Sequence, residues 1–212
     1  MINETRLLNE FLEFVQIDSE SGNERKMGEK LVEVLTALGL EVSTDRAGET
    51  FGSNGFNVFA RLDGEGEPIM LSAHMDTVIP GVGVKPVIRD GVIYSDGTTV
   101  LGGDDKSGIC GILEAVRVIL ENKLSHRPAE IVFSIGEEGG MRGAKAFDCA
   151  QLKAHRAYVF DSSGDVGKVI VEAPGQIKIF ADVIGRRAHA GLAPEEGISA
   201  IQVMAAAISA MN

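Results

Sequence analysis

The segment LSAHMDTVIPG (Leu71–Gly81) decides how the chain is interpreted. It continues an apolar run that starts at Pro68 and is typical of a strand. His74 and Asp76 lie two residues apart where this run stops, so their side chains share one face of an extended segment. The carboxyl ends of strands are where open α/β sheets place their sites. Polar residues at the ends of other strands are therefore candidates for the same site.

Helix-like and strand-like patterns alternate on both sides of this segment. Apolar residues at helical spacing predict helices around 7–15 and 27–38. Ser21 followed by Glu24 resembles a capping box for the second helix, and Gly39 is a typical end for it. Further predictions are strands at 41–44, 56–62, 68–73, 131–135 and 157–161, the last one buried, a hairpin near 91–94, and helices at 104–120 and 141–150. The alternation favours an α/β sandwich around a parallel or mixed sheet.

The pattern changes after Phe160. Segments 166–175 and 176–185 alternate like antiparallel strands, and 198–208 has helical spacing. We place a domain boundary near Ala173. A strand pair and one helix bury little apolar surface, so we expect the second part to be incomplete or to need partners.

Composition excludes several classes of protein. The net charge of −11 leaves no basic footprint for nucleic acid, and anionic membranes would repel it. Cys110 and Cys149 are isolated, as in a reducing compartment. The N-terminus does not resemble a signal peptide, and no apolar stretch approaches a membrane span. We expect a cytoplasmic protein with neither nucleic acid nor membrane as partner.

Two acidic motifs accompany His74. In GGDDKSG, Asp104 and Asp105 follow a glycine pair at a helix start, where one carboxylate can cap the helix or bridge two cations about 3.5–4 Å apart. In GEEGG, Glu137 and Glu138 follow a strand and point opposite ways, so one can bind metal while the other acts as a general base. A solvated acidic turn is the alternative for this pair.

Two aspartates at strand ends complete the pattern. Asp161 ends the strand AYVFD, a weak signal by itself. Asp76 would hydrogen-bond the ring nitrogen of His74 that does not bind metal, and so fix its tautomer. A lone histidine would more often be a core residue. With carboxylates at several strand ends, His74 instead indicates a two-metal hydrolase.

The motifs AHMDTV, LGGDDKSG and GEEGGMRGA, in this order and spacing, resemble the zinc metallopeptidase family that includes peptidase T, aminoacylase-1 and glutamate carboxypeptidases. FVQIDSESGNE and GRRAHAGLAPEEGISAI extend the resemblance over essentially the whole chain. SDGTTVLGGDDKSG is closest to the peptidase T-like branch. The resemblance implies a three-layer α/β/α catalytic domain with a mixed sheet (1–173), the start of a smaller α+β dimerisation or lid domain (174–212), and release of N-terminal residues from short peptides such as tripeptides.

The family pattern also implies roles for individual residues. His74 and Asp161 would bind one zinc ion, Asp104 would bridge two, and Glu138 would bind the second. Glu137 would be the general base. Cobalt or manganese would suit the same ligands. The resemblance further implies a cis peptide bond between Asp104 and Asp105.

His189 in RRAHAG matches a position of the small domain that reaches toward the substrate, often in a partner subunit, which implies a homodimer. A turn histidine beside Gly191 is an equally good interpretation. Family members continue past Asn212 and supply a final histidine to the second zinc, so we expect a C-terminally truncated chain whose own activity is open. The alternatives are a noncatalytic metal- or peptide-binding remnant and an acyl-amino-acid hydrolase of the same family.

Overall fold

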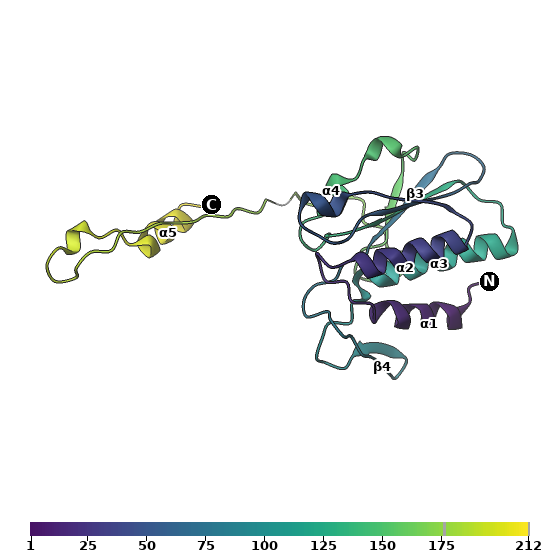
Figure 1. Ribbon diagram of the computed structural model, residues 1–212, viewed down its shortest axis with the longest axis horizontal. Coiled ribbons are helices and arrows are strands. Elements are labelled where there is room, and N and C mark those ends of the chain that lie inside the picture. Colours follow the sequence, from purple (N-terminus) through teal and green to yellow (C-terminus); the bar gives the residue numbers. More distant parts are fainter. Residues whose placement is uncertain (176, 212) are drawn as a thin grey trace. The chain divides into compact units, whose positions relative to one another are not determined.

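The computed structural model describes residues 1–175 and 177–211, which form two units (Figure 1). The first unit is Met1–Val166 and the second begins at Gly167, whereas the sequence predicts a boundary near Ala173. Assignment of the two parts to a catalytic domain and a dimerisation domain stays a prediction.

A five-stranded mixed sheet is the centre of the first unit. Its strands, in spatial order, are β1 (Glu41–Thr44), β2 (Val58–Leu62), β6 (Ala129–Ser134), β3 (Ile69–His74) and β7 (Ala157–Val159). β3 runs parallel to both β6 and β7, while β2 is antiparallel to β1 and β6. The predicted mixed sheet is confirmed. The carboxyl ends of the three parallel strands share one edge of the sheet.

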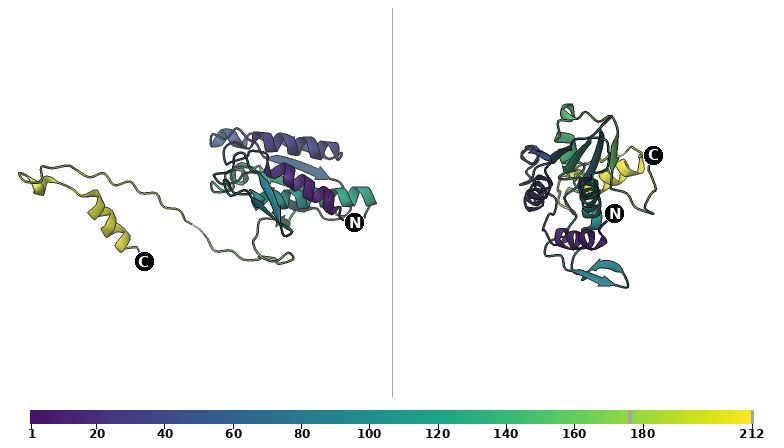
Figure 2. Two further views of the ribbon diagram at one scale, coloured as in Figure 1. Left: turned by 90° about the horizontal axis from the view of Figure 1, so that it is seen from below. Right: turned by 90° about the vertical axis from the view of Figure 1, so that its right-hand side faces the viewer.

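Helices cover both faces of this sheet, as predicted. They are α1 (Glu4–Val15), α2 (Arg25–Ala37), α3 (Gly103–Asn122) and α4 (Arg142–Ala146), with short 3₁₀ turns η1 (Ala47–Thr50) and η2 (Cys149–Gln151). One face packs against α2 and α3 through buried residues such as Leu35, Leu113 and Ile131. The opposite face is smaller and packs Phe59 against Phe147, with ring centroids 5.9 Å apart. Figure 2 shows these layers, with α1 beyond α3.

Local signals explain several element boundaries. α1 begins after Asn3, whose side chain accepts a hydrogen bond from the backbone N–H of Arg6. α2 is followed by Gly39 at φ +82°, as the sequence predicts. The predicted hairpin is also confirmed, with strands β4 (Pro86–Arg89) and β5 (Val92–Ser95) joined by a tight turn.

The predicted capping box of α2 is wrong. Glu24 occupies the N-cap position but makes no side-chain cap hydrogen bond. The Ser21 hydroxyl instead donates to Asp76, and the Glu24 carboxylate accepts from Gly22 and Gly136. The two residues of the S-x-x-E pattern therefore do not bond to each other's backbone, and both contact residues distant in sequence, Asp76 and Gly136.

Two predictions about later strands are also wrong. β7 is exposed rather than buried; it lies at the edge of the sheet and, among the described residues, pairs with β3 alone. The predicted antiparallel strands over 166–185 are not formed by the described residues, and Gln176 lies outside them. Apolar side chains such as Ile179 and Phe180 are exposed there. Alternating apolar residues form strands only where a sheet can bury them, and an isolated two-stranded hairpin is marginal in water.

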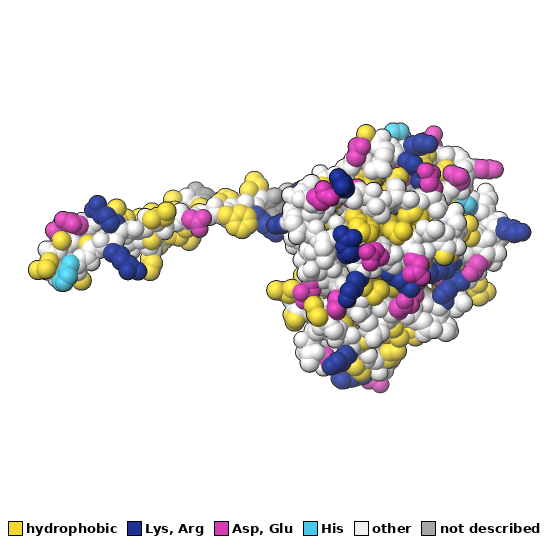
Figure 3. Space-filling model, in the orientation of Figure 1, with side chains coloured by type: hydrophobic (Ala, Val, Ile, Leu, Met, Phe, Trp, Pro, Cys, Tyr) yellow, Lys and Arg dark blue, Asp and Glu magenta, His cyan; other side chains and the backbone are white. Residues whose placement is uncertain are grey.

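The second unit contains η3 (Pro194–Glu196) and α5 (Ala200–Ser209), which confirms the predicted last helix. Ser199 caps α5 by accepting from the backbone N–H of Gln202. Within the described residues, no helix is long and apolar enough to cross a membrane. On the face drawn in Figure 3, acidic and basic side chains are interspersed on the first unit.

Candidate metal centre

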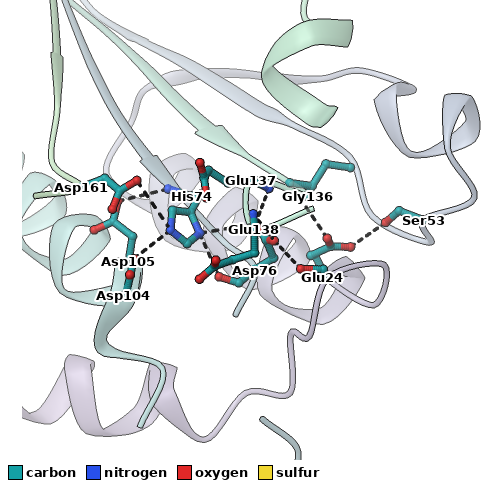
Figure 4. A network of polar contacts seen from close by, with 12 residues as sticks. Glu24, Ser53, His74, Asp76, Asp104, Asp105, Gly136, Glu137, Glu138 and Asp161 are labelled. Atoms are coloured by element: carbon teal, nitrogen blue, oxygen red, sulfur yellow. Dashed lines mark hydrogen bonds and ion pairs between the residues drawn. The ribbon is translucent and has the colours of Figure 1, made fainter. Parts of the chain in front are cut away.

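The sheet brings the acidic motifs to one edge. β3 ends at His74, which pairs in register with Ser134 at the end of β6. Glu137 follows β6 closely, and Asp161 follows β7. The first turn of α3 adds Asp104. Figure 4 shows the side chains of Asp104, Glu137 and Asp161 around the imidazole ring of His74.

His74 lies at the centre of two overlapping groups of potential metal ligands. Its ring is 2% exposed, and Nε2 lies 3.0 Å from Asp104 Oδ1 and 3.9 Å from Asp161 Oδ2. One group is His74, Asp104 and Glu138, and the other is His74, Glu137 and Asp161. Within each group the ligand atoms lie within 4.8 Å of one another. All four predicted ligands thus meet in space, and Glu137 is as close as they are.

Asp76 contacts both the histidine and the glutamate loop. Nδ1 of His74 lies 2.9 Å from the backbone oxygen of Asp76 and 3.4 Å from its Oδ1. The Asp76 carboxylate accepts hydrogen bonds from the Ser21 hydroxyl at 2.6 Å and from the backbone N–H groups of Glu137 and Glu138 at 2.9 and 3.2 Å. The backbone carbonyl is therefore the nearer partner of the ring, and the carboxylate mainly holds the loop.

Asp105 is a supporting residue whose specific role the sequence does not predict. The Asp104–Asp105 peptide bond is cis, as predicted. The Asp104 side chain is 70% exposed and faces His74, whereas Asp105 is buried. Asp105 accepts hydrogen bonds from the backbone N–H groups of His74 and Gly108, both at 3.2 Å. It therefore ties the end of β3 to the start of α3.

Charge on His74 depends on its acidic neighbours. Burial lowers the pKa of His74, but hydrogen bonds to Asp76 and Asp104 and the charge of Asp105 outweigh burial and raise the pKa to about 10. Burial likewise opposes ionisation of Asp76, yet its hydrogen bonds with His74, Ser21 and Glu137 hold the pKa of Asp76 below its usual value. These contacts favour the protonated form of the His74 ring.

The surrounding carboxyl groups are harder to ionise than usual. Burial raises the pKa of Asp105 to about 7. Burial also raises the pKa of Glu137, Glu138 and Asp161, with His74 opposing and neighbouring carboxylates adding to the rise. Several partly buried carboxylates thus share one imidazole. A divalent cation would relieve their repulsion, so the donor set fits such an ion.

His189 lies in the second unit and is exposed. Its Nδ1 accepts hydrogen bonds from the backbone N–H groups of Gly191 and Leu192, both at 3.2 Å. Within its own unit it is a turn histidine, and its predicted contact with substrate stays a prediction.

Known proteins share this sequence and fold. Residues 70–206 match the pattern of Peptidase family M20/M25/M40. The uncharacterized protein YqjE of Bacillus subtilis is 45% identical over 213 residues, which cover 100% of this chain and 57% of that protein. A tripeptidase structure from Staphylococcus aureus is 42% identical with a TM-score of 0.87, and that of the aminopeptidase PepT from Bacillus cereus is 40% identical with a TM-score of 0.83. The match to each structure covers 100% of this chain and 57% of the other.

The chain therefore spans a little over half the length of these relatives. Its similarity to both peptidase structures extends over the first unit, which holds the candidate metal centre, and over the second. Because the family pattern matches more than half of the chain, the protein belongs to peptidase family M20/M25/M40.

Proposed function

We propose that the protein is a divalent-metal-dependent peptidase that releases the N-terminal residue of short peptides, in particular tripeptides. The observation that carries this proposal is the convergence of four carboxylates around one buried histidine, with those of Asp104 and Asp161 next to Nε2. Similarity to the S. aureus tripeptidase and the B. cereus aminopeptidase supports the substrate class.

Zinc is the metal we propose, and cobalt or manganese would accept the same nitrogen and oxygen donors. His74 and Asp161 would hold one ion, Glu138 the second, and Asp104 would lie between them. When bound, the ions would acidify water and polarise the peptide carbonyl group.

Glu137 is the proposed general base. Burial raises the pKa of Glu137, and a higher pKa makes its carboxylate a better proton acceptor. It would take a proton from the attacking water and pass it to the leaving amine. Asp76 would keep Glu137 in place, since it accepts the backbone N–H of that residue at 2.9 Å.

The second unit would serve binding and assembly. We propose that His189 contacts the substrate and that residues 174–212 contribute to a homodimer. Nδ1 of His189 accepts two backbone hydrogen bonds, so Nε2 carries the proton in the neutral ring and can donate to an oxygen of the substrate. A cytoplasmic location would suit the two unpaired cysteines.

The test is hydrolysis of a tripeptide panel by zinc-loaded protein. We expect an N-terminal residue to be released, EDTA to abolish release, and Glu137→Gln to slow it at least about 100-fold while zinc stays bound. Glu121→Gln, a change on the exposed side of α3, is the matched control. Zinc and peptide binding without hydrolysis, in a chain whose intact mass shows it to be complete, would favour the noncatalytic alternative. Faster cleavage of acyl-amino acids would favour the acyl-amino-acid hydrolase.

A further inference from the structure

The four consecutive backbone amides from Ile135 to Glu138 each donate a hydrogen bond to a buried side chain. The acceptors belong to three residues that are at most 1% exposed. The pairs are Ile135 with Asn57 Oδ1 at 3.1 Å, Gly136 with Glu24 Oε1 at 3.1 Å, Glu137 with Asp76 Oδ1 at 2.9 Å, and Glu138 with Asp76 Oδ2 at 3.2 Å.

Glu24 joins three segments of the chain at this point. Its Oε1 accepts from the backbone N–H groups of Gly22 and Gly136, at 2.9 and 3.1 Å. Its Oε2 accepts from the Ser53 hydroxyl at 2.6 Å. A Cβ atom at Gly55 would lie 3.1 Å from Oε2, so glycine there leaves room for the carboxylate. Figure 4 shows Glu24 between Ser53 and Gly136.

We infer that Glu24 is a positioning residue for the Glu137–Glu138 pair. Gly136 has φ +61°, a backbone conformation that favours glycine, and glycine is also the most mobile residue when it is not held. The hydrogen bond to Glu24 fixes the peptide unit just before the two glutamates. Without it, Gly136 can rotate, and Glu138 can leave the position in which it faces His74 and Asp104. This inference rests on the proposed function, which gives the two glutamates their roles.

Glu130 provides a matched control. It is also a buried glutamate, 3% exposed, and its carboxylate also accepts backbone hydrogen bonds, here from Lys153 and Ala154. It lies near the start of β6, whereas the Glu137–Glu138 pair follows the end of that strand. Glu130→Ala therefore measures the general cost of removing a buried, hydrogen-bonded carboxylate.

The first test measures amide hydrogen exchange in the metal-free chain by NMR. We expect Glu24→Ala to speed exchange of the Gly136, Glu137 and Glu138 amides at least about tenfold, because a bond to a charged group is lost. Glu24→Gln keeps an oxygen that can occupy the position of Oε1, so its exchange should stay within about threefold of wild type. Glu130→Ala should leave these amides protected. Unchanged protection in Glu24→Ala, or equal loosening in Glu130→Ala, overturns the inference.

Ser53→Ala keeps the test decisive if Glu24→Ala does not fold. It removes the hydroxyl that donates to Oε2 and that also accepts the backbone N–H of Gly55, and it leaves the Glu24 carboxylate in place. We expect a smaller acceleration of the same three amides, and no acceleration would count against the inference.

The second test measures cobalt affinity in a double-mutant cycle with Glu138→Gln. Outer residues that orient a ligand typically change metal affinity 10–100-fold. We expect Glu24→Ala to weaken cobalt binding about tenfold, but less than about twofold when Glu138 is already substituted. An equal loss in both backgrounds would mean that Glu24 has only a general structural role. If wild-type protein binds no cobalt, the proposed function fails, and amide exchange still decides the role of Glu24.

Discussion

Metal binding should displace a proton from His74, and the pH dependence of affinity measures this directly. In the metal-free protein, burial opposes protonation of His74, but Asp76, Asp104 and Asp105 raise its pKa to about 10. A metal ion requires a free Nε2. A pH of 7 lies about three units below this pKa, so removing the proton from His74 at pH 7 costs about 4 kcal/mol. Affinity at pH 7 should therefore be about 1000-fold below its limit at high pH.

The assay is calorimetric titration of zinc at pH 6.5, 7.5 and 8.5, in buffers that differ in ionisation enthalpy. We expect affinity to rise at least about tenfold per pH unit and about one proton or more to be released per ion. His155→Ala, which removes an exposed histidine, should leave both quantities unchanged. A flat affinity with no proton released at pH 7.5 would mean that His74 is neutral in the metal-free protein or is not a ligand, contrary to this expectation.

Four further outcomes follow from the same structure. Zinc at about 100 times its Kd should raise the free energy of unfolding by about 2.7 kcal/mol, and EDTA should reverse the gain in a thermal melt. The raised pKa of His74 stabilises the folded state below its usual pKa near 6.5, so urea unfolding of metal-free protein should show stability falling as the pH rises from about 7 toward 10. Leu113→Ala, at a fully buried position in α3, should lower the free energy of unfolding by about 2–5 kcal/mol in the same assay. The candidate metal centre should be unchanged in the refolded variant. Glu114 accepts hydrogen bonds from Arg6 and from the N–H of Asn3, and these bonds lower its pKa. Glu114→Ala should therefore lower the free energy of unfolding by about 2 kcal/mol at pH 7, and by less below about pH 4.5. An equal loss at both pH values would contradict this pairing.

The sequence predicted those elements that bury a continuous apolar face. β3, β6 and α3 follow the pattern of their apolar residues closely, because each packs into the main core. The pattern failed over 166–185, where alternation alone predicted strands. Strand formation depends on a neighbouring sheet, and that information is not local.

The candidate ligands could be identified for a related reason. His74, the glutamate pair and Asp161 follow parallel strands whose ends share one edge, so a correct strand assignment brings them together. The residues that hold these ligands in place could not be recognised from strand assignment. Ser21 and Glu24 have the local spacing of a helix cap, but their partners Asp76 and Gly136 lie 55 and 112 residues away. Only the folded chain distinguishes the two arrangements.

We propose that His74, Asp104, Glu138 and Asp161 hold divalent metal ions. An anomalous difference map from zinc-soaked crystals, recorded at the zinc edge, would locate these ions. We expect density next to Nε2 of His74, within bonding distance of Asp104 and of Asp161 or Glu138, and no density there in His74→Ala crystals. Zinc bound only at other surface carboxylates, or density that persists in His74→Ala, would contradict this proposal.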